Sequence, residues 1–140
     1  SRCEIMLDNY CKTVLIEANT MIDMAKTEIA PAISAYVLEL ANTASTKKAV
    51  DESISCGYET ELLKKLSGFE EQISIYAEEL EEAVMNLQDI EDIETKAYGI
   101  RDRVLNKMSE LRVVCDEAEK VTAKKYWPFP TYGELLFGVR

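Results

Sequence analysis

Residues 66–90, LSGFEEQISIYAEELEEAVMNLQDI, contain the clearest structural pattern in the 140-residue chain. Apolar side chains recur there at alternating steps of three and four positions. This spacing is typical of the seam of a left-handed coiled coil or helical bundle, and it predicts a long helix packed against other helices. The residues of this seam are Leu66, Phe69, Ile73, Tyr76, Leu80, Ala83, Leu87 and Ile90.

The chain before this seam predicts another long helix, from about residue 4 to residue 44. Pro31 is its only breaker and is expected to kink the helix or split it in two, so an observer would count three or four helices. The polar run 42–46, NTAST, is expected to form the first turn, which places the second helix at about 46–89. The apolar residues at helical spacing in the first helix are Ile5, Leu15, Ile22, Ala25, Ile29, Ile33, Tyr36 and Leu40.

The chain after the seam predicts a third helix, from about residue 92 to residue 123. Ile100, Val104 and Met108 follow one another by two consecutive steps of four, which indicates a local relaxation of the supercoil. No strand-like alternation occurs in the sequence. We therefore expect an all-α fold, an up-down-up bundle of three long helices forming a single domain over residues 1–140.

Composition narrows the classes of partner. The net charge is −10 and the isoelectric point is about 4.6, so nucleic acids and anionic membrane surfaces are not expected to bind. No apolar run reaches the ~20 residues of a membrane span, and residues 1–20 lack the pattern of a signal peptide. The four cysteines, Cys3, Cys11, Cys56 and Cys115, show no C-x-x-C pairing and lie in helical, core-like patterns, which fits reduced thiols. The chain is expected to be cytoplasmic.

The chain contains no histidine. This excludes Ser-His-Asp and Cys-His catalysis and the Glu-x-x-His sites of di-iron bundles. The sequence also has no D-x-D-x-D-G calcium loop and no phosphate-binding G-K-[ST] motif. We therefore expect no catalytic, cofactor-binding or metal-ligating residue in this chain.

Ten acidic residues and no basic ones lie between positions 70 and 94, which equals the net charge of the whole chain. In the register of the seam most of these acids fall on the outer face of the helix. We interpret these acidic residues as a solvent-exposed surface of the helix. The alternative is that they form a docking strip for a basic partner.

The end of the chain differs from the rest, because YWPFPTYGELLF (126–137) holds five of its eleven aromatic residues. Pro128 and Pro130 stop the third helix and favour an extended chain. The T-x-x-E pattern from Thr131 to Glu134 predicts a capping box and a short final helix. We expect residues 126–140 to form a latch that packs on the bundle, whereas a ligand for an aromatic groove of another protein is the alternative. The latch residues are Trp127, Pro128, Phe129, Pro130, Thr131, Tyr132, Glu134, Leu135, Leu136 and Phe137.

Two segments carry a resemblance to a known family. Residues 10–36, YCKTVLIEANTMIDMAKTEIAPAISAY, and residues 127–137, WPFPTYGELLF, resemble the C-terminal region of type III glutamine synthetases, the large bacterial form. The resemblance implies a parent enzyme that condenses glutamate with ammonia using ATP and Mg or Mn, and that forms a homo-oligomer. Its metal site uses carboxylates and a histidine, so the resemblance implies that the catalytic domain is not part of this sequence.

Two functions remain open at this point. The first is a non-catalytic helical domain of a glutamine synthetase that serves structure, assembly or regulation. The second is a helical-bundle adaptor of an unrelated cytoplasmic protein. Glu17, Ile75 and Met85 are candidates for contact with the catalytic domain; the alternative is that all three are ordinary exposed side chains.

Overall fold

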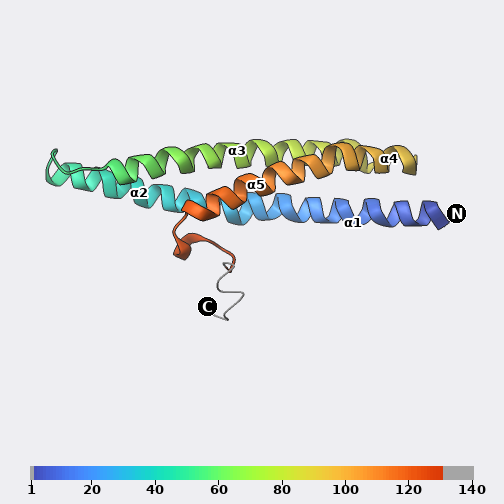
Figure 1. Cartoon of the computed structure of the whole chain (residues 1–140), viewed down its shortest axis with the longest axis horizontal. Helices are drawn as coiled ribbons and strands as arrows, with labels where there is room; N and C mark the ends of the chain where they lie inside the picture. Colours follow the sequence, from blue (N-terminus) through green and yellow to red (C-terminus); the bar gives the residue numbers. More distant parts are fainter. Residues whose placement is uncertain (1, 131–140) are drawn as a thin grey trace.

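The computed structural model describes residues 2–130, which contain no strand. The first rod comprises α1 (Arg2–Met24), the π-helix η1 (Ala25–Ile29) and α2 (Ala30–Val50). Figure 1 shows these elements as one continuous rod. Pro31 lies in the first turn of α2, and the backbone N–H of Ala30 donates to the carbonyl of Ala25 in the wider π pattern. The expected kink or split at Pro31 is therefore a π-helical segment just before the proline.

The first turn was predicted in the wrong place. Residues 42–46 are helical, and the turn is formed by residues 51–56. The hydroxyl of Thr43 donates to the carbonyl of Glu39 at 2.9 Å, so this polar side chain bonds within the helix instead of capping it. Asp51 makes the turn instead, since its carboxylate accepts from the backbone N–H and the hydroxyl of Ser53 at 2.9 and 2.8 Å.

The second rod is α3 (Gly57–Gln88), which begins about ten residues later than predicted and ends where predicted. Leu66, Ile73, Leu80 and Leu87 are at most 1% exposed, so the central positions of the predicted seam are confirmed. The other seam residues are half-buried and pack against the core: Phe69, Tyr76, Ala83 and Ile90.

The third rod comprises α4 (Ile93–Gly99), the π-helix η2 (Ile100–Val104) and α5 (Leu105–Val121), and the 3-10 turn η3 (Lys124–Tyr126) follows. Asp92 caps its start by accepting from the backbone N–H of Thr95 at 3.1 Å, as the predicted boundary requires. Ile100, Val104 and Met108 are apolar residues spaced four positions apart, and this spacing coincides with η2. Ala25, Ile29 and Ile33 have the same spacing and coincide with η1. A π turn holds more residues than an α turn, so residues four positions apart stay on the same face of the helix. Both sets of apolar residues therefore remain on the buried face.

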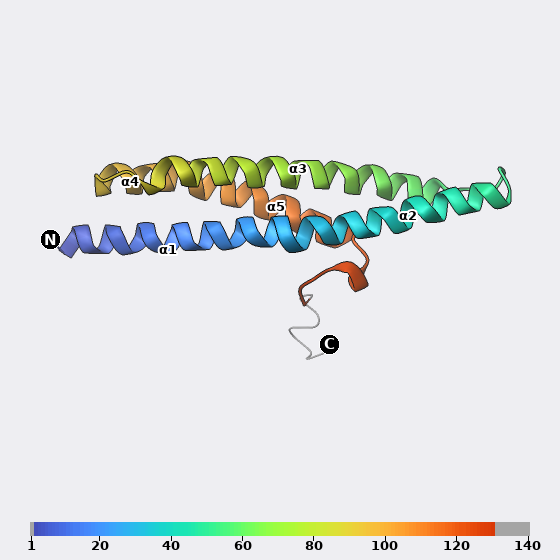
Figure 2. The same cartoon turned by 180° about the vertical axis from the view of Figure 1, so that it is seen from behind.

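The three rods lie side by side, α3 antiparallel to the first rod and the third rod returning parallel to it (Figures 1 and 2). The predicted all-α class with three long helices is confirmed. Ile5, the first of the apolar residues at helical spacing, is 63% exposed. The start of α1 extends beyond α4 (Figure 1). Within residues 2–130, no helix is both long and apolar enough to cross a membrane.

The third rod is shorter than the other two. Figures 1 and 2 show that α5 ends beside the middle of the first rod, so the end of α2 and the start of α3 form a two-helix hairpin. We call residues 41–65 the hairpin end, and residues 2–40 with 66–121 the bundled part. In the hairpin end, the buried residues are Cys56 and Glu59.

Candidate functional site

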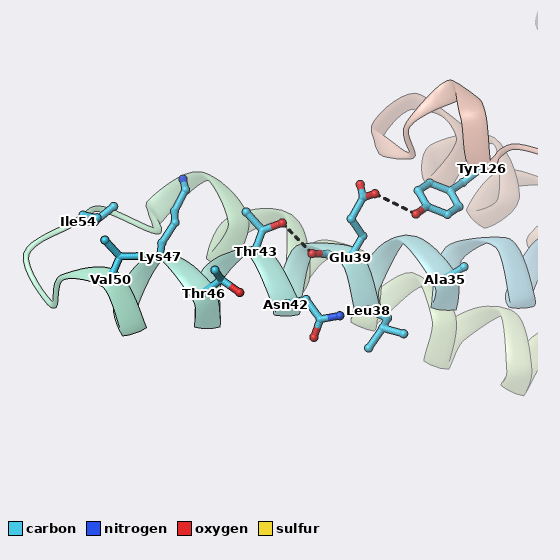
Figure 3. Close-up of a pocket in the computed structure, with 10 residues that line it drawn as sticks. All are labelled: Ala35, Leu38, Glu39, Asn42, Thr43, Thr46, Lys47, Val50, Ile54 and Tyr126. Atoms are coloured by element: carbon cyan, nitrogen blue, oxygen red, sulfur yellow. Dashed lines mark hydrogen bonds between the residues drawn. The ribbon is translucent and has the colours of Figure 1, made fainter.

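The start of the predicted latch is held on α2 by four side chains that we call the tail anchor: Tyr36, Glu39, Lys125 and Tyr126. The hydroxyl of Tyr126 donates to Glu39 Oε1 at 3.0 Å, and Lys125 Nζ lies 2.9 Å from the same oxygen. The rings of Tyr36 and Tyr126 pack with centroids 5.4 Å apart. Figure 3 shows Tyr126 pointing toward Glu39 from the end of the chain.

Electrostatic effects accompany this geometry. The hydrogen bonds from Lys125 and, secondarily, Tyr126 lower the pKa of the Glu39 carboxyl. The acceptor Glu39 raises the pKa of the Tyr126 hydroxyl. Burial is the main cause of a raised pKa at Tyr36. At neutral pH, the anchor therefore holds a carboxylate, an ammonium and a neutral phenol in one hydrogen-bonded group.

A shallow pocket of about 610 Å³ lies along α2 beside the tail anchor (Figure 3). Its wall is mainly apolar, and Leu38 and Val50 are 61% and 75% exposed. A mainly apolar wall with a few polar side chains is an arrangement that suits binding. The lining residues are Ala35, Leu38, Glu39, Asn42, Thr43, Thr46, Lys47, Val50, Ile54 and Tyr126.

The described part of the predicted latch packs on the bundle. Trp127 and Phe129 are half-buried against the core, whereas Pro128 and Pro130 are exposed. The other predicted latch residues lie outside the described residues: Thr131, Tyr132, Glu134, Leu135, Leu136 and Phe137.

The residues proposed to contact a catalytic domain do not come together. Glu17 is exposed on α1, at the edge of a groove between α1 and α5. Ile75 and Met85 are 46% and 62% exposed on α3. The structure thus gives two separate surfaces, one on the α1 side and one on the outer face of α3.

The acidic outer face of α3 is partly neutralised by other rods. Lys26 Nζ lies 3.0 Å from Glu81, and Lys107 Nζ lies 3.4 Å from Glu79. These pairs join α3 to η1 and α5, which the heptad register alone did not indicate. Because the side chains of both pairs are a third to a half exposed, each pair is expected to contribute little to stability.

The hairpin end contains an ion pair with a buried carboxylate, Lys47 with Glu59, which the sequence did not predict. Glu59 is 5% exposed, and its Oε2 accepts from Lys47 Nζ at 2.7 Å. Its other oxygen, Oε1, is buried without a hydrogen-bond partner. The hydrogen bond from Lys47 is the main cause of a lowered pKa at Glu59. No spacing rule links two residues twelve positions apart across a turn, so no sequence signal pointed to this pair.

Metal-binding side chains do not gather in the described part of the chain. Residues 2–130 contain no group of three or more Cys, Asp or Glu side chains that could hold an ion. These residues therefore do not fit a divalent-metal site. All four cysteines are free; Cys3 is exposed, contrary to the core-like position predicted, and burial raises the pKa of Cys115 to about 11.

Comparison with known proteins shows which family this helical chain resembles. Residues 1–48 match the family described as the glutamine synthetase C-terminal domain. The chain is 35% identical, over its whole length, to a glutamine synthetase of Butyrivibrio fibrisolvens. It is 27% identical over 98% of its length to a type-3 glutamine synthetase of Dictyostelium discoideum, and 26% identical over 97% to a glutamine synthetase of Bacteroides fragilis.

The chain spans about a fifth of the length of these relatives, covering 20%, 19% and 19% of them. The predicted resemblance to the C-terminal region of type III glutamine synthetases is confirmed, because residues 1–48 match the C-terminal-domain family and the whole chain is similar to about a fifth of each relative.

Proposed function

We propose that this chain is a non-catalytic helical domain of a type III glutamine synthetase, and that it serves the structure and assembly of that enzyme. The observation that carries the proposal is the match of the entire chain to about a fifth of each relative. In this proposal the parent enzyme is a homo-oligomer that ligates ammonia to glutamate with ATP and Mg or Mn. In this proposal the domain supplies contact surfaces, and the catalytic groups come from the rest of the enzyme. The parent enzyme is proposed to be cytoplasmic.

The amino-acid composition supports the non-catalytic part of the proposal. The metal site of the family combines carboxylates with a histidine, and this chain has no histidine. We expect the isolated chain to form no glutamine from glutamate, ammonium and ATP-Mg. We also expect calorimetric titration to detect no saturable ATP-Mg binding tighter than about 1 mM, a threshold of about 4 kcal/mol. Saturable binding below that concentration would contradict a non-catalytic role.

The outer face of α3 supports the assembly part. Ile75 and Met85 are exposed apolar side chains on the most acidic helix. Exposed apolar side chains do not stabilise a solvated acidic surface. A contact with the catalytic domain or a neighbouring subunit would bury Ile75 and Met85 and remove their apolar surface from water. Contact between these two residues and the remainder of the enzyme is therefore part of the proposal.

The test uses the full-length enzyme that carries this sequence. Ile75→Asp and Met85→Asp place charges at the proposed contact, and Glu82→Gln alters an exposed neighbour on the same helix. Light scattering is expected to show smaller assemblies for the two Asp variants and an unchanged mass for Glu82→Gln. Unchanged assembly in both Asp variants would contradict the assembly role. Circular dichroism of the isolated chains would show whether the helices remain intact.

A further inference from the structure

In the described part of the chain, the hairpin end has no third rod. The third rod turns away after Val121, so that α2 packs mainly on α3 over the rest of its length (Figures 1 and 2). A third helix buries the apolar stripes that a pair of helices leaves exposed. The hairpin end therefore offers a position for further helices.

The pocket of about 610 Å³ beside the tail anchor lies along α2 in this region, and we call it the α2 groove. It begins at the turn, where Val50 and Ile54 line it, and it ends at Tyr126 (Figure 3). Its helical part, residues 35–50, is about 23 Å long, or four turns. Leu38 and Val50 are largely exposed in it. The groove is thus long enough and apolar enough for a contact between helices.

The two ends of the α2 groove carry opposite charges. Asp51 and Glu52 lie in the exposed turn at one end, and Lys124 and Lys125 lie in η3 at the other. Lys125 is paired with Glu39, whereas Lys124 extends from the exposed surface of η3. A groove that is acidic at one end and basic at the other is complementary to itself when a two-fold axis crosses its middle. Each acidic end then meets the basic end of the other copy.

The net charge of the hairpin end also favours a second copy as the partner. Two chains that each carry a charge of −10 repel one another, and the repulsion is strongest where the acidic residues of positions 70–94 would meet. The hairpin end, residues 41–65, contains four basic and four acidic residues, so it has no net charge. Two copies can therefore approach one another through their hairpin ends while the acidic parts of α3 stay far apart relative to the screening length of about 8 to 10 Å.

We propose that the α2 groove binds a second copy of this chain, related to the first by a two-fold axis that crosses the groove near Thr43. The two hairpin ends then lie antiparallel and form a four-helix bundle. Leu38 and Val50 of both copies are removed from water, and Glu52 of each copy lies near Lys124 of the other. The contact gives the assembly part of the proposed function a defined surface, and its role in the parent enzyme rests on that proposed function.

Sedimentation equilibrium of the full 140-residue chain tests the contact in the absence of the rest of the enzyme. The mass is expected to rise from 15.8 kDa toward twice that value, with a dissociation constant below about 1 mM. Val50→Asp places a charge in the groove and should weaken dimerisation about tenfold or more. Val113→Asp is the matched control, since Val113 is exposed on α5 outside the groove, and it should leave the dissociation constant unchanged. Circular dichroism should show equal helix content in both variants.

Charge reversal tests the antiparallel arrangement. Glu52→Lys and Lys124→Glu should each weaken dimerisation by about threefold to tenfold, because each places like charges opposite one another. An equal mixture of the two variants should dimerise as tightly as the parent chain, because opposite charges then meet at both ends of the groove. Single reversals without effect, or a mixture that stays weak, would overturn the arrangement.

A chain that remains monomeric up to about 1 mM would overturn the proposal as a whole, and the α2 groove would then face another part of the enzyme. Equal weakening by Val50→Asp and Val113→Asp would overturn it too, since the contact would not lie in the groove. These outcomes are distinguishable from failure of the proposed function, because that function is tested through Ile75 and Met85 on α3 and in the full-length enzyme.

Discussion

The bundled part and the hairpin end share α2 and α3 but are held together differently. In the bundled part three rods meet, and four seam residues of α3 are almost inaccessible to solvent: Leu66, Ile73, Leu80 and Leu87. In the hairpin end only two helices meet, and one of the two buried side chains is a carboxylate. Two helices cannot enclose a wide apolar stripe, so this end relies on half-buried contacts and on the Lys47–Glu59 pair. The comparison teaches that the length of the third rod decides where the core ends.

Truncation of the α3 seam is expected to have the largest effect. Leu80 is 0% exposed, so Leu80→Ala should lower the free energy of unfolding by about 2 to 5 kcal/mol. Glu82 is exposed on the same helix, and Glu82→Ala should stay within about 0.5 kcal/mol. Urea denaturation measures both. Equal midpoints for the two variants would mean that the core does not lie along this seam.

The two glycines of the bundled part should respond in opposite directions. A Cβ on Gly99 would lie 2.6 Å from Leu87 Cδ2, in a fully buried contact between α4 and α3. Gly99→Ala is therefore expected to destabilise the protein by about 1 to 3 kcal/mol. A Cβ on Gly68 would meet no atom within 4 Å, so Gly68→Ala should stabilise α3 by about 0.5 to 1 kcal/mol. Thermal or urea unfolding decides the signs, and stabilisation by Gly99→Ala would contradict the close approach of the two helices.

The ion pair of the hairpin end should make its stability depend on pH. The pKa of Glu59 is lower in the folded chain than its ordinary value of 4.5, chiefly because Lys47 donates a hydrogen bond to it. The ionised Glu59 therefore contributes fully to the free energy of unfolding above about pH 5, and this contribution is lost as the pH falls through the lowered pKa of the folded state. Glu59→Gln should flatten the dependence of stability on pH below 5. Glu52→Gln, in the exposed turn, is the control and should leave the dependence of stability on pH unchanged. An identical dependence for Glu59→Gln and the parent chain would count against the Lys47–Glu59 pair.

The end of the chain should give the smallest signal, and Trp127 reports it because it is the only tryptophan. Trp127 is half-buried against the core, so acrylamide should quench its fluorescence less than that of free indole. Tyr126→Phe removes the hydrogen bond to Glu39 and is expected to raise the quenching constant moderately. Quenching equal to that of free indole in the parent chain would show that this segment does not pack on the bundle.

Periodicity predicted the helices because a seam repeats many times. Leu66, Ile73, Leu80 and Leu87 all lie on the same buried face. The local relaxation predicted at Ile100, Val104 and Met108 falls where the structure has the π-helix η2. The turn was misplaced because a single turn has no repetition. The small polar residues at 42–46 favour caps only weakly, and Asp51 with Ser53 provides the stronger turn chemistry.

The candidate site was harder to predict than the fold. The aromatic and proline content of the last fifteen residues drew attention to the latch, and Trp127 and Phe129 do pack on the core. The partners of the latch were missed, because Glu39 lies 86 positions from Lys125 and only the folded arrangement brings them together. Lys47 and Glu59 were missed for the same reason, since pairing across a turn depends on where the turn falls.

Amide hydrogen exchange, resolved along the chain, tests the comparison most directly. Amides of residues 66–88 and 105–118 are expected to exchange only through global unfolding, because their side chains form the three-rod core. Amides of residues 41–50 and 57–65 are expected to exchange faster, through local opening of the two-helix hairpin, and their protection should fall further in Glu59→Gln. Equal protection in the two parts would contradict the account, since it would mean that the hairpin end opens only with the bundle.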